Sequence, residues 1–226
     1  MQTVIETELI QFDGWALRVR PSSNPKRLLL LIHGFTGDEN SMWVFARGLP
    51  DHYWMIAPRA PHAAETGGYS WRSLPPPDSS TASGLRFGMS SLDQLQPSAE
   101  ALIRLMDAYQ ASAGTEADDI DVIGFSQGAV MCNVLAFLYP RRIRKVGILA
   151  GFVPDGLDAL VSQRPLSGKP FFVTHGTKDE TVAIAHAHAS IELLEQAGAH
   201  VTYCEDDVGH KVSVNCLQAL KKFFAD

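Results

Sequence analysis

Long hydrophobic runs, basic charge and cysteine are scarce in this chain, and each scarcity argues against a class of protein. The longest wholly aliphatic run covers residues 28–32, far short of the ~20 residues that span a bilayer. A formal net charge of -6 argues against nucleic acid or an anionic membrane as partner, because both attract basic surfaces. The acidic N-terminal stretch lacks the basic and apolar regions of a signal peptide.

The cysteines Cys132, Cys204 and Cys216 are too few and odd in number to imply a disulfide framework. The simplest interpretation is a soluble protein of the cytoplasm, and a periplasmic protein that has lost its signal is the alternative. No spacing of histidine or cysteine suggests a metal site, and neither a G-x-G-x-x-G nor a P-loop pattern occurs. We therefore expect no metal and no cofactor.

Hydrophobic residues are plentiful at 46% of the 226 residues, and they are arranged in a repeating order. A hairpin is expected over residues 3–19, around Asp13-Gly14. Short runs that are apolar on both faces then alternate with amphipathic segments at 97–109, 181–196 and 212–224. The runs are "RLLLLIHG", "YWMIAP", "IDVIGF", "KVGILAG", "PFFVTHG" and "HVTYCE". This alternation predicts one α/β domain over residues 1–226, with a mostly parallel sheet covered by helices on both faces.

Residues 59–90 follow neither the strand period nor the helix period and contain three consecutive prolines. A loop of this length inside a compact domain is usually functional or mobile. We predict that it forms a lid or a wall of a substrate site, and a disordered insertion is the alternative. Its apolar residues suit a pocket or a dimer contact equally, so a homodimer stays open.

The stretch "DVIGFSQGAV" places Ser126 between an expected strand and an expected helix, flanked by glycines two positions away. This is the context of the G-x-S-x-G nucleophile elbow, whose sharp turn leaves no room for Cβ atoms at Gly124 and Gly128. A serine at a helix N-cap is the alternative, since the pentapeptide by itself is a weak signal. A serine nucleophile also needs a base and an acid to be active at neutral pH.

His210 is the best candidate for the base, because it follows the last strand and precedes the last helix. A loop at this sheet edge can bring an imidazole over the serine. His33 and His175 each end a strand before a glycine, and we expect them to pack or hydrogen-bond locally. Asp179, after the strand "PFFVT", is the favoured acid, and Asp155 is the second choice. The order Ser126, Asp179, His210 is that of α/β-hydrolases.

A serine hydrolase also needs two N–H groups that face the developing oxyanion. We expect one from Gln127, which follows the serine, and one from Phe35, in the loop after the strand "LLLLI". Phe35 and Trp43 are then expected to face the acyl pocket, although core packing explains Trp43 equally well. Tyr69, Trp71 and Leu74 of the long loop complete the predicted substrate-binding residues.

The segments "LLIHGFTGDE", "IGFSQGAVM", "FFVTHGTKDETV" and "GH" resemble the phospholipase/carboxylesterase family of α/β-hydrolases. The resemblance runs from about residue 28 to the C-terminus, and its block His175-Gly176-x-x-Asp179-x-x-Val182 favours Asp179 over Asp155. It implies a fold without a large helical cap and hydrolysis of esters or thioesters without a cofactor. By position, Ser126 is the nucleophile, His210 the base, Asp179 the acid, and Phe35 and Gln127 the oxyanion donors.

These observations favour a serine hydrolase that cleaves small-molecule carboxylic esters with small or medium acyl chains, through an acyl-enzyme. Acyl-protein thioesterase or lysophospholipase activity keeps the chemistry and changes the substrate. A hydrolase fold that binds a small hydrophobic ligand without catalysis is an alternative of another class. The stretch "HAAETGGYSWRSLPPPD" only loosely resembles the substrate-side loop of the family, so the resemblance implies no acyl-chain preference.

Overall fold

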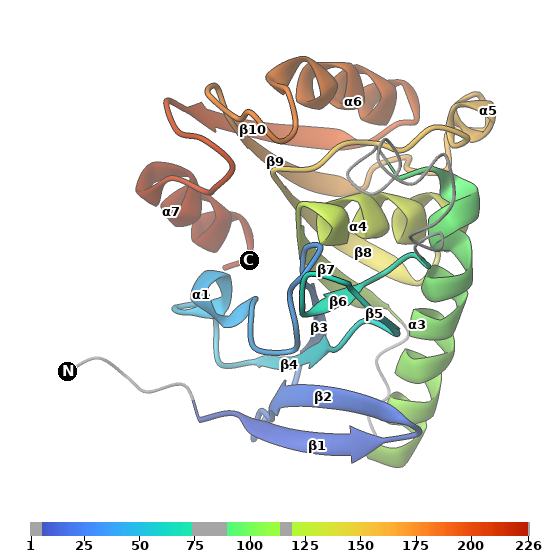
Figure 1. The fold of residues 1–226 in the computed structure, drawn as a ribbon, viewed down its shortest axis with the longest axis vertical. Coiled ribbons are helices and arrows are strands. Elements are labelled where there is room, and N and C mark those ends of the chain that lie inside the picture. The colour runs from blue at the N-terminus through green and yellow to red at the C-terminus, as the bar shows by residue number, and fades with distance from the viewer. Residues whose placement is uncertain (1–5, 74–89, 114–118, 226) are drawn as a thin grey trace.

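The computed structural model describes residues 6–73, 90–113 and 119–225 (Figure 1). Their main strands are β1 (Glu8–Phe12), β2 (Trp15–Arg20), β3 (Arg27–Ile32), β4 (Tyr53–Pro58), β7 (Ile120–Phe125), β8 (Ile143–Leu149), β9 (Pro170–Gly176) and β10 (His200–Asp206). The helices are α1 (Trp43–Ala46), α3 (Leu92–Ala113), α4 (Gln127–Leu138), α5 (Asp158–Val161), α6 (Ile184–Gln196) and α7 (Val214–Phe223). The strands β5 (His62–Ala63) and β6 (Tyr69–Ser70) form a separate short hairpin.

Eight of the described strands form one sheet in the order β1-β2-β4-β3-β7-β8-β9-β10. The pairs β1–β2 and β2–β4 are antiparallel, whereas each neighbouring pair from β4 to β10 is parallel. The predicted hairpin is present, and Asp13 and Gly14 both have positive φ, as a two-residue turn of this kind requires. The predicted α/β fold with a mostly parallel sheet is therefore confirmed.

Alternation along the central strands explains why the sheet is covered on both faces. In β3, Leu28, Leu30 and Ile32 pack into one core cluster. Leu29 and Leu31 point the other way, into a second cluster. The first cluster includes residues of α3, α4 and α6, and the second includes residues of α1 and α7 (Figure 1). None of the described helices is long and apolar enough to cross a membrane.

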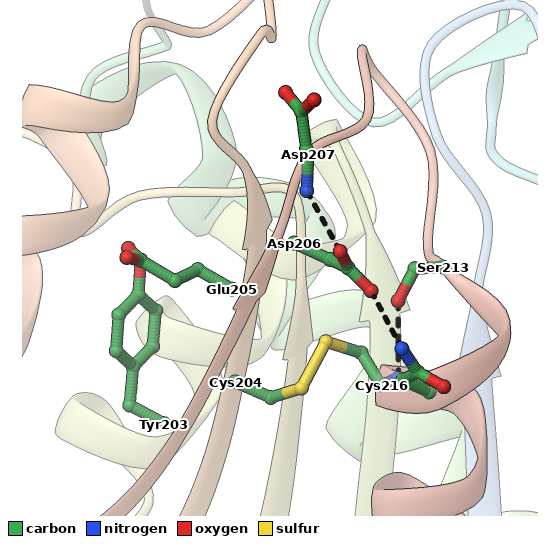
Figure 2. The surroundings of a disulfide bond; sticks show 8 residues. Tyr203, Cys204, Glu205, Asp206, Asp207, Ser213 and Cys216 are labelled. Carbon is green, nitrogen blue, oxygen red and sulfur yellow. Dashed lines mark hydrogen bonds between the residues drawn. A yellow bond between two sulfur atoms is a disulfide. The ribbon is translucent and has the colours of Figure 1, made fainter.

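A disulfide joins Cys204 in β10 to Cys216 in the first turn of α7, with Cα atoms 5.7 Å apart (Figure 2). The expectation drawn from the odd cysteine count was therefore wrong. Three cysteines allow one bridge and one free thiol, and the free thiol is the buried Cys132. The number of cysteines does not reveal that β10 and α7 bring two of them together. With a disulfide present, the argument for a reducing compartment loses its basis.

The expected loop over 59–90 is described only in part, and Leu74 lies outside the described residues. Its first part forms the β5–β6 hairpin, which packs next to the loop that follows β3. In particular, Tyr69 pairs with Gly37 in an isolated antiparallel bridge. That the loop acts as a lid or substrate wall stays a prediction.

Candidate active site

Ser126 lies on a sharp turn between the end of β7 and the start of α4. Its backbone has φ 53° and ψ -119°, a conformation that is strained for a residue with a Cβ. The neighbouring glycines are needed for the reason expected from the sequence. A Cβ at Gly124 would lie 2.2 Å from the carbonyl oxygen of Gly128, and one at Gly128 would lie 2.0 Å from that of Ile32. The turn therefore holds the serine hydroxyl above the carboxyl end of the sheet.

His210 lies in the loop between β10 and α7, and both of its ring nitrogens have partners. Nε2 lies 2.9 Å from Ser126 Oγ, and Nδ1 lies 2.6 Å from Asp179 Oδ2. With the proton on Nδ1, the ring donates to Asp179 and Nε2 is left to accept from the serine hydroxyl. Three residues from separate loops thus form one hydrogen-bonded row.

Asp179 follows β9, and its side chain is fully buried. Oδ1 accepts hydrogen bonds from the backbone N–H groups of Thr181 at 2.8 Å and Val182 at 2.9 Å. Burial by itself raises the pKa of Asp179, but the hydrogen bonds from Val182, His210 and Thr181 outweigh burial and hold that pKa below its ordinary value. The carboxylate is therefore ionised at neutral pH. Asp155 is exposed and has no comparable contact with His210 in the described structure.

The loop of His210 is fitted closely to the loop of Asp179. The backbone N–H of Thr177 donates to Asp206 O at 2.9 Å, and that of Lys178 donates to Val208 O at 3.0 Å. A Cβ at Gly176 would lie 2.2 Å from Val208 O, so only glycine permits this approach. These contacts hold the imidazole and the carboxylate in register.

The loop after β3 places Phe35 beside the serine turn. A Cβ at Gly34 would lie 3.3 Å from Ser126 Cβ, which shows how closely the two segments approach. Gln127 directly follows Ser126 and is the first residue of α4, so its N–H has no acceptor within the helix. The two segments expected to supply oxyanion donors therefore both lie next to Ser126.

His33 supports this loop from inside the protein. Its Nδ1 lies 2.7 Å from Gly34 O, and its Nε2 accepts from the N–H of Ala60 at 3.0 Å. This pairing requires a neutral ring protonated on Nδ1. Burial is the main reason that the pKa of His33 is lowered, which favours the neutral ring. The expectation that His33 bonds locally is confirmed.

The segment of Tyr69 and Trp71 supports both flanking segments. Tyr69 O accepts from Thr36 N–H at 3.0 Å, and Tyr69 N–H donates to Gly37 O at 2.9 Å. Trp71 donates from Nε1 to His33 O at 2.8 Å, and its backbone N–H donates to Gln127 Oε1 at 2.9 Å. The Trp71 side chain is completely buried. It therefore lies under the loop and offers no surface to a substrate in this conformation.

An ion pair that sequence reasoning missed completes this support. Glu39 is buried and receives two hydrogen bonds from Arg59, at 2.7 and 2.8 Å. These hydrogen bonds are the main reason that the pKa of Glu39 is lowered. The guanidinium of Arg59 also lies 4.7 Å from the ring centroid of Tyr69. No periodicity or motif marks this pair, because its partners lie in different loops.

Trp43 lies in α1 and donates from Nε1 to Glu39 O at 2.9 Å. Its side chain packs against the second core cluster. It also lines a surface hollow of about 1180 Å³, together with residues such as Arg47 and Lys221. None of Ser126, Asp179 and His210 is among the described residues that line this hollow. The packing alternative for Trp43 thus has direct support, and a contact with substrate stays a prediction.

Among the described residues, no group of three or more His, Cys, Asp or Glu side chains is arranged to hold a metal ion. The groups that the structure brings together at Ser126 are a hydroxyl, an imidazole and a carboxylate. These are the groups of nucleophilic acyl transfer.

Comparison with known proteins identifies the family of this chain. The model of the family described as Phospholipase/Carboxylesterase matches residues 16–226. The chain is 28% identical over 107 residues to Carboxylesterase SOBER1 of Arabidopsis thaliana, and this match covers 46% of each chain, so it spans less than half of that relative. It is 27% identical over 204 residues to Acyl-protein thioesterase 1 of Debaryomyces hansenii, covering 81% of this chain and 83% of the relative.

A solved structure has the same fold. The carboxylesterase from Mesorhizobium loti superposes with a TM-score of 0.77 at 20% identity, covering 97% of this chain and 98% of that one. At this identity the likeness concerns the fold alone.

Proposed function

Because this chain belongs to the phospholipase/carboxylesterase family of α/β-hydrolases, we propose that it is a serine esterase. It cleaves small-molecule carboxylic esters through a covalent acyl-enzyme. The observation that carries the proposal is the row Ser126 Oγ···Nε2 His210 Nδ1···Oδ2 Asp179, with distances of 2.9 and 2.6 Å. A serine that merely capped a helix would need neither partner, and the side chain of Ser126 makes no capping hydrogen bond.

In the first half of the reaction, Ser126 Oγ attacks the ester carbonyl carbon while His210 Nε2 takes the hydroxyl proton. The carbonyl oxygen becomes an oxyanion, which the N–H groups of Gln127 and Phe35 stabilise by hydrogen bonds. The bond to the leaving alcohol breaks, and His210 returns its proton to that alcohol. The ionised Asp179 keeps the ring oriented and stabilises the imidazolium while it carries two protons.

In the second half, a water molecule takes the place of the alcohol. His210 accepts a proton from the water as its oxygen attacks the acyl carbon. A second oxyanion forms in the same position, and it collapses with release of the carboxylic acid. The proton on His210 returns to Ser126 Oγ, so the enzyme ends as it began.

The proposal is tested with short p-nitrophenyl esters and the variant Ser126→Ala. We expect kcat to fall by about 10⁶, the loss typical of a missing serine nucleophile. Ser112→Ala serves as the control, because Ser112 lies in the last turn of α3 and its hydroxyl donates to Tyr109 O within the same helix. An alanine variant at 126 that keeps most of the activity would show that the nucleophile is another residue.

Two other functions are separated from this one by further assays. A fluorophosphonate probe labels Ser126 in an active hydrolase, whereas a non-catalytic binder stays unlabelled. The relative named Acyl-protein thioesterase 1 favours thioesters as the second substrate class. A panel of esters, acyl-cysteine thioesters and lysophospholipids of varied chain length decides between these substrates by their values of kcat/KM.

A further inference from the structure

His175 is a second imidazole in contact with the carboxylate of Asp179. It is the penultimate residue of β9, and its side chain is fully buried. Its Nε2 lies 2.8 Å from the carbonyl oxygen of Val182 and 3.3 Å from Asp179 Oδ2. Because both neighbours are acceptors, the ring carries its proton on Nε2 and donates it to Val182 O, the nearer of the two. Asp179 Oδ2 thus lies between two imidazole N–H groups, one from His210 and one from His175.

The other ring nitrogen makes the residue unusual. His175 Nδ1 is buried and has no hydrogen-bond partner among the described residues. A buried acceptor without a partner destabilises the folded state, and an apolar side chain of similar size would avoid this cost. A requirement for the Nε2–H donor accounts for a polar ring at this position in spite of that cost.

The Nε2–H group closes the turn that carries the acid. Val182 O accepts from His175, while Val182 N–H donates to Asp179 Oδ1 at 2.9 Å. Val182 therefore links His175, at the end of β9, to the carboxylate of Asp179. With Thr181 N–H also on Oδ1 at 2.8 Å, Oδ1 has two backbone donors, while Oδ2 has His210 as its hydrogen-bond partner and His175 Nε2 in contact at 3.3 Å. These contacts restrict the rotation of the carboxylate about its Cβ–Cγ bond.

We propose that His175 is a positioning residue, which holds Asp179 in the orientation that His210 needs. The inference rests on the proposed esterase function. His175 donates to Val182 O and contacts Asp179 Oδ2 at a longer distance, so it acts mainly by fixing the turn and secondarily by limiting the position of the carboxylate. Without this donor, Asp179 Oδ2 keeps His210 as its partner but loses the contact that limits its position.

Three substitutions test the proposal in ester hydrolysis. His175→Gln places an amide N–H near the position of Nε2, His175→Asn places the same group near Nδ1, and His175→Leu removes it. We expect the Leu and Asn variants to lose about 10- to 100-fold in kcat with KM unchanged, as for reacting groups misplaced by up to ~1 Å. We expect the Gln variant to recover most of this loss. Thermal unfolding of each variant is measured to show that it is folded at the assay temperature, so that a fall in kcat does not result from unfolding.

Each outcome decides. Folded Leu and Asn variants with wild-type kcat would overturn the proposal, and so would equal losses in Gln and Asn, because ring shape rather than the donor would then matter. Failure of all three variants to fold would make His175 a structural residue and would also overturn it. Wild type and Ser126→Ala are assayed alongside. A wild-type protein that hydrolyses no ester refutes the proposed function, whatever the His175 variants do.

Discussion

Removal of the Cys204–Cys216 disulfide is expected to lower the stability of the protein while leaving the active site assembled. The bridge spans 12 residues of sequence, and the chain-entropy relation for a loop of that length gives about 3 kcal/mol at 25 °C. Domains have free energies of unfolding of about 5–15 kcal/mol, so this is a large fraction. With an m-value of about 3 kcal/mol/M, the urea midpoint falls by about 1 M.

The activity should respond much less than the stability, for a structural reason. The segment closed by the bridge contains His210, but other contacts hold this segment as well. Asp206 O and Val208 O accept backbone hydrogen bonds from the loop of Asp179. Ser213 Oγ accepts from Cys216 N–H at 3.1 Å and caps α7. These contacts remain when the sulfur–sulfur bond is broken, so kcat at 25 °C should change little.

The assay compares the oxidised wild type with the double variant Cys204→Ser, Cys216→Ser by urea unfolding and ester hydrolysis. A thiol titration of the denatured chain comes first: the oxidised protein should show one reactive thiol, that of Cys132, and the reduced protein three. Three thiols before reduction would mean that the bridge does not form. Equal urea midpoints for the two proteins, with the bridge present in the wild type, would refute the loop-entropy argument.

Three further predictions concern the candidate active site. Gln127→Pro removes a backbone N–H that α4 does not use, and proline is tolerated at the first helical position. We expect kcat to fall by about 10²–10³ relative to the control Gln127→Ala, which keeps the N–H. Equal kcat values for the two variants would show that Gln127 does not stabilise the oxyanion. The lowered pKa of Asp179 means that its contribution to stability is present above pH ~4 and is lost as pH falls through its folded pKa. The free energy of unfolding, measured between pH 2 and 6, should therefore fall less steeply toward acid for Asp179→Asn than for the wild type. An equal pH dependence of the two proteins would contradict this. Gly128→Ala places a Cβ 2.0 Å from Ile32 O, so we expect the free energy of unfolding to fall by about 1–3 kcal/mol and kcat to fall as well. An unchanged melting temperature would show that the turn accommodates a Cβ at this position.

The sequence by itself carried the fold and the three residues of the hydrogen-bonded row. Runs that are apolar on both faces predicted buried parallel strands, and the carboxyl ends of such strands meet at one edge of the sheet. Ser126, Asp179 and His210 each follow one of those strands, so their convergence was predictable from order alone. The flanking glycines of Ser126 were predictable too, because the crowding that requires them is local.

Only the tertiary structure decided the roles of residues whose partners lie elsewhere in the chain. Trp71 appeared from its loop to be available to substrate, but it is buried against His33 and Gln127. The pair Glu39–Arg59 and the bridge between Cys204 and Cys216 depend on which loops and helices come together in space. Composition and periodicity report how each segment buries its own side chains. They carry no record of contacts between segments, which form only when the folded chain brings those segments together.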